Sequence, residues 1–372
     1  MRGTFKIVTV ADIPVKLHWT FGLLLLWPAY VAYGTGFQLG LVAWLALFIL
    51  ALFFCVVLHE YGHALTARHY GVKTRDIILS PIGGVARLER LPEQPWQEFS
   101  IALAGPLVNV AICCVMAPYF LIYPFDSVWT IARQLLQGGS APTLADLSLH
   151  FIPILFMINI LLASFNLLPA FPMDGGRVFR ALLSIRLGRR RATQLAAYVG
   201  QALAVGFMFH GFYQGVFLNI FIGLFVFFTA AQEYRVVRLE SLLTENTVRE
   251  LLRRQFTALR SEESLERAVE GLKQGVEKNF LVMNEAEKVI GVLHEEFLLE
   301  AIKQKDESAP VASYLSDRFE VIDPDTSLKT IFLKMQEQGY SILPVYEDDK
   351  LVGVIDVSMM NNFLRLQQKL IK

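Results

Sequence analysis

An apolar run of 18 residues, LVAWLALFILALFFCVVL at 41–58, contains no charged residue, glycine or proline. Charge-free apolar stretches of this length are typical of membrane-spanning helices, because they match the thickness of the hydrocarbon core. The run continues directly into HEYGH at 59–63, so two histidines and a glutamate enter a lipid-soluble helix. Ionisable side chains inside a span are costly, and their presence there indicates a function.

Similar apolar stretches recur along residues 1–240, and 54% of the 372 residues are hydrophobic. This composition favours a polytopic α-helical membrane protein, and we predict about six transmembrane helices. The expected spans are about 18–33, 41–66, about 99–123, one that starts near 151 and is broken at LLPAFP, and two within 192–232 that hinge near HGFYQG.

Lysine and arginine are concentrated in alternate connections between these spans. The basic connections contain Arg2, Lys6 and Lys16, then Arg68, Lys73, Arg75, Arg87 and Arg90, then Arg186, Arg189, Arg190 and Arg191, and finally Arg235 and Arg238. The remaining connections contain only Arg133. Because basic loops stay in the cytoplasm, the pattern predicts a multi-pass cell-membrane protein with both termini cytoplasmic. The N-terminus lacks the features of a cleavable signal peptide, so the first span is expected to direct insertion.

The composition changes near residue 241. Residues 1–240 contain 17 Lys and Arg against 11 Asp and Glu, whereas residues 241–372 contain 17 against 23. The tail repeats the order helix, short strand, helix, strand, turn, strand, helix with a period of roughly 60 residues. We therefore predict a membrane domain at 1–240 and two cytoplasmic αβ modules at 241–305 and 306–372. The acidic tail argues against nucleic acid as a partner.

The motif HEYGH fits the pattern H-E-x-x-H. Histidines four residues apart project from one helix face, so His59 and His63 can bind one zinc ion. Glu60 lies beside them, where a carboxylate can act as general base toward water. The alternative is three polar residues at a wet membrane border. Their position at the end of an apolar span favours the metal site.

A catalytic zinc needs a third protein ligand and one open position. Asp174, in NLLPAFPMDGGR at 166–177, is the only acidic residue between Asp146 and Glu233. Two prolines break the helix before it, and broken helices at membrane depth line polar cavities. Two glycines after it allow close backbone approach. Asp174 is our candidate third ligand; the alternative is that it only caps the following helix.

Three motifs together resemble the site-2 protease family of intramembrane zinc metalloproteases: HEYGH, GPLVN at 105–109, and NLLPAFPMDGG. The resemblance covers residues 1–235. It implies that His59, His63 and Asp174 hold one zinc ion per chain and that Glu60 is the general base.

Two asparagines, Asn109 and Asn166, match membrane asparagines of that family. The resemblance implies that they position substrate or stabilise a developing oxyanion. For each of them the alternative is a helix–helix hydrogen bond.

The segment RDIILSPIGGVARLER at 75–90 reads as two extended runs around a Pro/Gly turn. It resembles the membrane-associated β-loop of site-2 proteases, whose edge could pair with an unwound substrate strand. The alternative is a hairpin with a packing role. Arg68 marks the expected cytoplasmic end of the second span, which puts the metal roughly 10–14 Å inside that surface. This depth suits a substrate that is itself a transmembrane segment.

The two αβ modules resemble a pair of cystathionine-β-synthase-type (CBS) domains, which often sense adenine nucleotides. The family's G-[VI]-[IV]-[TS]-x-x-D ending supplies a hydroxyl and a carboxylate to the nucleotide. The corresponding positions are His294 and Phe297 in the first module and Asp356 and Met359 in the second. We therefore expect weak or absent nucleotide binding, and a structural or dimerising role, as in a homo-oligomer, fits these endings at least as well.

The resemblance implies a zinc metalloendopeptidase that cuts membrane proteins within or near their transmembrane segments, as in regulated intramembrane proteolysis. A zinc transporter with a regulatory CBS tail is one alternative, but transport does not require Glu60 directly after the first histidine. A catalytically inactive membrane scaffold is another, and the intact HEYGH and Asp174 count against it.

Overall fold

The computed structural model describes residues 3–34, 39–81, 83–89, 92, 94–122, 150–275 and 277–370. The chain divides into two compact units, 1–234 and 235–372, and each has hydrophobic clusters of its own. The connection expected after the third span, which contains Arg133, lies outside the described residues, as does Arg90.

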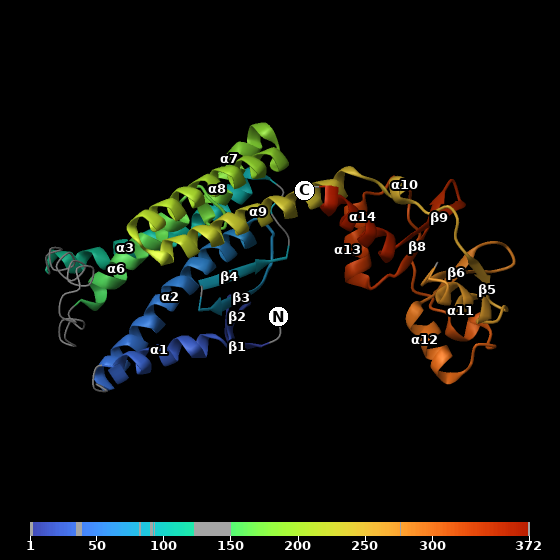
Figure 1. Cartoon of the computed structure of the whole chain (residues 1–372), viewed down its shortest axis with the longest axis horizontal. Coiled ribbons are helices and arrows are strands. Elements are labelled where there is room, and N and C mark those ends of the chain that lie inside the picture. Colours follow the sequence, from blue (N-terminus) through green and yellow to red (C-terminus); the bar gives the residue numbers. More distant parts are fainter. Residues whose placement is uncertain are drawn as a thin grey trace. The chain divides into compact units, whose positions relative to one another are not determined.

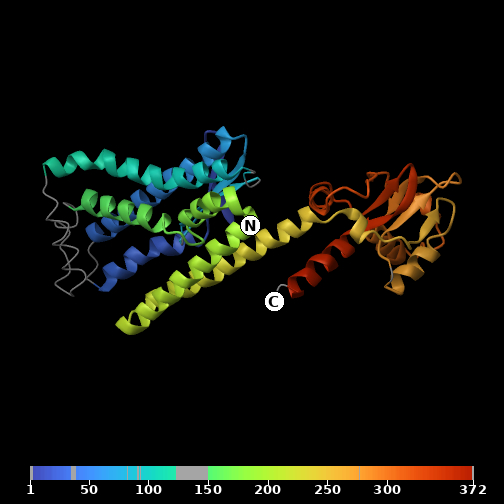
Figure 2. The same cartoon turned by 90° about the horizontal axis from the view of Figure 1, so that it is seen from above.

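The N-terminal unit combines long helices with a small sheet (Figure 1). Its helices are α1 (Phe21–Gly34), α2 (Leu39–His69), α3 (Pro95–Met116), the 3-10 turn η1 (Ala117–Leu121), α6 (Phe151–Asn166), α7 (Asp174–Leu187), α8 (Arg189–Gln214) and α9 (Phe217–Glu245). Helix α3 contacts α2, α6 and α7. Figure 2 shows the helices of this unit from above. Helix α9 runs without a break past residue 234 into the C-terminal unit.

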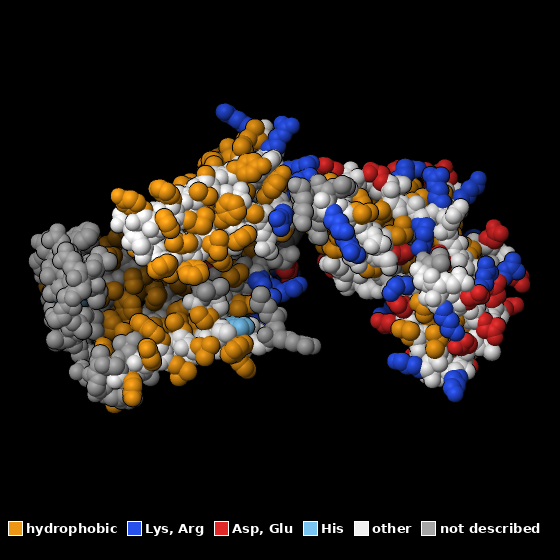
Figure 3. Space-filling view, in the orientation of Figure 1, with side chains coloured by type: hydrophobic (Ala, Val, Ile, Leu, Met, Phe, Trp, Pro, Cys, Tyr) orange, Lys and Arg blue, Asp and Glu red, His pale blue; other side chains and the backbone are white. Residues whose placement is uncertain are grey.

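Four helices in the described part of the chain are long and apolar enough to cross a membrane: Leu39–His69, Pro95–Leu121, Arg189–Gln214 and Phe217–Glu245. Large apolar side chains on these helices are exposed, such as Phe54 at 63% and Phe209 at 71%. Apolar side chains cover the face of this unit seen in Figure 3. An exposed apolar surface of this extent indicates an integral membrane protein. Helices α1 and α6, with 14 and 16 residues, are shorter than a full span.

The start of the first expected span was wrong. Residues Thr4–Val10 (β1) and Ile13–His18 (β2) form an antiparallel hairpin, so α1 begins only at Phe21. Ala11 and Asp12 connect the strands with φ of 49° and 61°, as a two-residue hairpin turn requires. The turn was not predicted, because neither of its two residues is a glycine or an asparagine.

The sheet has the order β1-β2-β3-β4, with β3 at Thr74–Ser80 and β4 at Gly83–Leu88. Strand β2 pairs parallel with β3, and β3 pairs antiparallel with β4, which confirms the two extended runs expected around the Pro/Gly turn. The sheet packs on α1 and α2 through a shared cluster. Its buried members are Ile13, Val15, Phe21, Ile49, Phe53, Tyr61, Ala64, Ile77 and Leu79. This packing leaves β4 as an edge strand beside α2.

Both expected interruptions of the helical bundle are confirmed. Helix α6 ends at Asn166 and α7 begins at Asp174. A Cβ atom on Gly176 would lie 2.7 Å from the carbonyl carbon of Ala170, so only glycine lets α7 approach the connection this closely. Gly215 ends α8 in the left-handed conformation, at the hinge expected near 210–215.

The C-terminal unit contains α10 (Val248–Leu251), β5 (Ala258–Arg260), α11 (Glu266–Lys273), β6 (Phe280–Met283), β7 (Val289–Leu293), α12 (Glu295–Gln304), the 3-10 turn η2 (Val311–Tyr314), α13 (Leu328–Gln338), β8 (Ile342–Glu347), β9 (Lys350–Asp356) and α14 (Val357–Leu370). Strands β5, β6 and β7 form one sheet, and β8 and β9 form another. The short strand expected before α13 is reduced to a bridge between Ile322 and Val345. Acidic and basic side chains are scattered over the visible face of this unit (Figure 3).

The two αβ modules exchange their first segments. Val248 of α10 packs in the cluster that contains Leu328, Ile355 and the rest of the second module's core. Val311 of η2 packs instead in the cluster of the first module. A third cluster, formed by Leu281, Val292, Ile342 and Val354, joins β6 and β7 to β8 and β9. The modules therefore share a core and form one body.

Candidate metal centre

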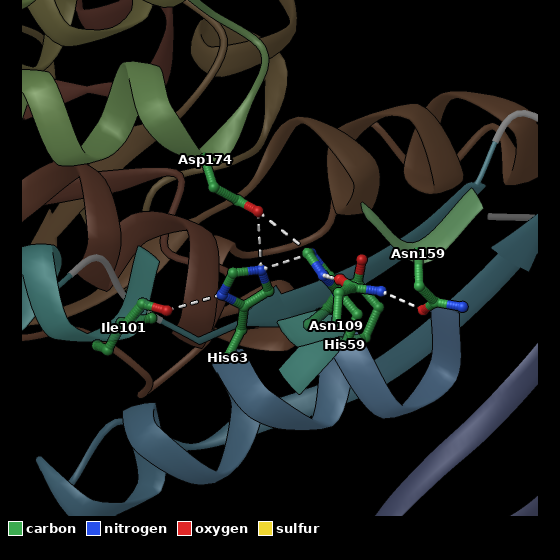
Figure 4. Close-up of polar contacts among 8 residues, drawn as sticks. His59, His63, Ile101, Asn109, Asn159 and Asp174 are labelled. Carbon is green, nitrogen blue, oxygen red and sulfur yellow. Dashed lines mark hydrogen bonds and ion pairs between the residues drawn. The ribbon is translucent and has the colours of Figure 1, made fainter. Parts of the chain in front are cut away.

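Three possible metal ligands converge from two helices (Figure 4). The Nε2 atoms of His59 and His63, one turn apart on α2, lie 3.1 Å from each other. Oδ2 of Asp174, the first residue of α7, lies 3.2 Å from each of them. Asp174 stands in the first turn of α7, one residue after the N-cap position, which is Met173.

The far nitrogens of both histidines face hydrogen-bond acceptors. Nδ1 of His63 lies 2.7 Å from the carbonyl oxygen of Ile101, and Nδ1 of His59 lies 2.5 Å from Oδ1 of Asn109. The nitrogen of the Asn109 amide donates to Oδ1 of Asn159 at 2.8 Å, which fixes the oxygen of Asn109 toward His59. Both histidines therefore carry their proton on Nδ1, and each Nε2 offers a lone pair.

The three ligand atoms of His59, His63 and Asp174 fit a divalent cation. Two imidazole lone pairs and a carboxylate oxygen are all acceptors, and three converging acceptors need a positive charge between them. Tetrahedral zinc with bonds of about 2.0–2.1 Å separates its ligands by about 3.3 Å, close to the distances found here. Three protein ligands leave the open fourth position of a catalytic zinc site.

Glycines allow the helices to come together at this point. A Cβ atom on Gly105 of α3 would lie 2.7 Å from Nε2 of His59 and closer still to the ring of His63. A Cβ atom on Gly62 would lie 2.8 Å from the carbonyl oxygen of Ala104. Only glycine at both positions lets α3 pass directly against the two histidines.

All six residues proposed from the sequence line one cavity of about 290 Å³: His59, Glu60, His63, Asn109, Asn166 and Asp174. The edge strand β4 forms one wall of this cavity. Oε2 of Glu60 accepts a hydrogen bond from the backbone nitrogen of Ala86 at 2.8 Å. Gly84 lies so close that a Cβ atom there would be 2.8 Å from Cγ of Glu60. Strand β4 therefore holds the Glu60 carboxylate beside the histidines.

The two asparagines differ in their surroundings. Asn109 is fully buried, and its two polar atoms contact His59 on α2 and Asn159 on α6. Asn166, at the end of α6, is partly exposed to the cavity. The sequence analysis missed Asn159. Asn159 could have been found in the sequence as the amide residue in the apolar stretch 151–163. In the structure its side-chain nitrogen donates to the carbonyl of Leu155, four residues earlier.

The comparisons with known proteins identify the families that this chain resembles. The model of peptidase family M50 matches residues 47–207, and the CBS domain model matches residues 311–364. A zinc metalloprotease of Methanocaldococcus jannaschii is 31% identical over 376 residues, which cover 100% of this chain and 99% of that relative. The solved structure of a site-2 protease from the same organism is 33% identical and covers 62% of this chain and 95% of that chain, with a TM-score of 0.43.

The fold and the site define an intramembrane metalloprotease with a C-terminal CBS region. This chain belongs to peptidase family M50, the site-2 proteases, whose members are zinc metalloproteases. The transporter and scaffold alternatives are not favoured.

The residues at the expected nucleotide-binding positions of the CBS modules contact other protein groups. The side chain of Asp356 is buried; its Oδ1 accepts from the backbone nitrogen of Met359 at 2.8 Å and its Oδ2 lies 3.3 Å from Arg253. The ring of His294 packs 5.9 Å from that of Phe297, and burial lowers the pKa of His294. Neither module presents a hydroxyl at these positions.

Proposed function

We propose that His59, His63 and Asp174 hold one Zn²⁺ and that Glu60 is the general base of a peptide-bond hydrolysis. The convergence of three acceptor atoms at 3.1–3.2 Å from one another carries this proposal. A zinc ion bound there would lower the pKa of water and polarise the substrate carbonyl. Glu60 accepts the proton of the attacking water and returns it to the leaving amine.

The surrounding amides have different roles in this proposal. Asn109 orients His59, because its oxygen accepts from Nδ1. Asn166 is the group left to contact the substrate carbonyl, since it faces the cavity and lies eight residues before Asp174. An amide placed there would stabilise negative charge on that oxygen.

The substrate of an intramembrane protease is a membrane protein, and we propose that a transmembrane segment enters in extended form and pairs with β4. The free edge of β4 lines the cavity, and Glu60 already bonds to that edge. An added strand would run past Glu60 and the metal ligands, so backbone pairing would hold the scissile bond extended.

We further propose six spans with both termini in the cytoplasm. The four long helices together with α1 and α6 account for six, and the basic residues lie in alternate connections. Reporter fusions at 36, 137 and 213 should report outside the cell membrane, and those at 75, 190 and 372 inside. A cytoplasmic signal at 137 would overturn the topology.

The C-terminal residues form the modules 241–305 and 306–372 in this proposal. They govern assembly or substrate access by packing against each other or a second subunit, and nucleotide binding is weak. The burial of Asp356 against Arg253 supports this.

The decisive experiment uses purified protein in lipid nanodiscs, with elemental analysis beside a cleavage assay on single-pass membrane proteins. The membrane proteomes of cells with active and inactive enzyme supply candidate substrates, as single-pass proteins shortened only by the active enzyme. We expect one zinc per chain and cleavage within or near the transmembrane segment. Stoichiometric zinc without cleavage of any candidate would favour a scaffold, and zinc flux into sealed vesicles would favour a transporter.

A further inference from the structure

Arg180 is the largest fully buried side chain in the described part of the chain, with 1% of its surface exposed. Its guanidinium contacts two carboxylates from other helices. Nε donates to Oε1 of Glu98 on α3 at 2.7 Å, and Nη2 donates to the same oxygen. Nη1 donates to Oε1 of Glu233 on α9 at 2.7 Å. One cation thus joins α3, α7 and α9.

Such a triad is a poor choice for stability alone. Removing charges from water is energetically costly, and well-packed apolar side chains often stabilise a protein as well as or better than a buried ion pair. A guanidinium instead constrains geometry, because its planar N–H donors fix the position of each carboxylate that they bind. The position of Arg180 in the fold shows which residue its contacts hold in place.

Arg180 lies on the short helix that begins with the metal ligand Asp174. Its guanidinium also lies 5.0 Å from the centre of the Phe171 ring, in the connection just before Asp174. Its partner Glu98 precedes Ile101 by three residues on α3, and the carbonyl of Ile101 accepts from His63. The triad therefore ties the helix of one metal ligand to the helix that orients another.

We propose that Arg180 is a positioning residue for Asp174, which holds α7 in the rotation that aims the carboxylate at His59 and His63, and that Glu233 makes this position depend on α9. The inference rests on the proposed zinc site. Because α9 continues unbroken from Glu233 to Glu245 in the C-terminal unit, a rotation or axial shift of α9 would move the carboxylate that Arg180 binds. Through this ion pair, a movement of α9 that starts in the CBS region would change the position of Asp174.

The first test compares zinc affinity by chelator competition in full-length protein in nanodiscs. The variant Arg180→Met/Glu98→Leu removes both deeply buried charges and keeps apolar volume, so we expect it to fold with an unfolding temperature near that of the wild type. We expect its zinc affinity to fall by about tenfold or more, and kcat to fall more than KM. Arg186→Met, an exposed position in the last turn of the same helix, is the control and should match the wild type.

A purely structural role predicts the opposite: the folded double variant would bind zinc like the wild type, and that result would overturn the proposal. Glu233→Gln gives a second, milder test, because its side chain is 32% exposed and the Arg180–Glu98 pair remains. We expect zinc affinity to fall by about twofold to fivefold. An unchanged affinity would overturn the role of α9, whether or not the double variant folds.

Asp174→Asn separates this inference from the zinc site itself. If the wild type binds no zinc, the proposed function fails. If Asp174→Asn loses zinc while the double variant and Glu233→Gln keep it at wild-type affinity, the metal site stands and only the positioning role fails.

Discussion

Nδ1 of His59 lies 2.5 Å from Oδ1 of Asn109, and both side chains are buried. Asn109 is in turn held by Asn159, whose own amide donates to the carbonyl of Leu155 at 2.8 Å. This series of hydrogen bonds, here called the relay, links α2, α3 and α6 and ends at His59, a proposed metal ligand. The amides of Asn109 and Asn159 each have one orientation in which the nitrogen faces an acceptor and the oxygen faces a donor. The imidazole is thereby fixed before any metal binds.

Asn159→Leu should weaken zinc binding although Asn159 touches no ligand. Without its acceptor, the amide of Asn109 is free to turn its nitrogen toward His59, where two donors would oppose each other. We expect a loss of zinc affinity of about tenfold, measured by chelator competition. Ser164→Ala, an exposed position on the same helix, is the control. Wild-type affinity in Asn159→Leu would show that the relay does not orient His59.

Glu60→Gln should keep zinc and lose cleavage. The amide oxygen of glutamine can still accept from the backbone nitrogen of Ala86, so the side chain keeps its place but cannot accept the proton. We expect a rate reduced by about 10²–10⁴, with zinc content near that of the wild type. His63→Ala should lose both. Folded Glu60→Gln protein that contains no zinc would make Glu60 a ligand and refute its role as base.

Gly105→Ala should damage the metal centre by sterics alone. The added methyl would lie 2.7 Å from Nε2 of His59 and overlap the ring of His63, so α2 and α3 must separate. We expect zinc content and cleavage to fall together. Gly206→Ala is the matched control in another membrane helix, because nothing lies within 4 Å of its added methyl. Full zinc content in Gly105→Ala would mean that the helices are not in contact as described.

The sheet beside the site should lose stability only in acid. Asp76 is fully buried in β3, where hydrogen bonds from Arg87 and then from Lys16 lower its pKa to about 2, below an unfolded value of about 3.9. Because the folded pKa is the lower one, the stabilisation is complete above about pH 4 and is lost as the pH falls toward 2.

Unfolding temperatures of the wild type and Asp76→Asn, measured from pH 7 to pH 2, test this. The wild type should be the more stable above pH 4, and the difference should shrink as the pH falls. A difference that stays constant over that range would show that Asp76 does not titrate in this way.

The C-terminal modules should bind adenine nucleotides weakly or not at all. Asp356 is committed to Arg253 and to the backbone of Met359, and a carboxylate there repels phosphate. Calorimetry with ATP and AMP on residues 241–372, which contain the hydrophobic cluster of each module, measures this. Asp356→Thr/Met359→Asp restores the family ending and should bind more tightly than the wild type. Micromolar binding by the unaltered fragment would refute the prediction.

The sequence by itself determined those features that depend on neighbours along the chain. Apolar runs identified α2 and α3, the i and i+4 spacing placed His59 and His63 on one face, and prolines and glycines marked the break before Asp174. It did not predict β1 and β2, because the turn at Ala11 and Asp12 contains neither a glycine nor an asparagine that would mark a hairpin.

Only the tertiary structure decided which groups meet across the bundle. His59 and Asn109 are 50 residues apart, His59 and Asp174 are 115 apart, and Arg180 and Glu98 are 82 apart. Three contacts depend on the rotation of each helix about its axis and on close approach at glycine. They are the hydrogen bond to Glu60, the relay through Asn159 and the triad around Arg180. Local patterns do not encode that rotation, because it results from packing against all neighbouring helices at once.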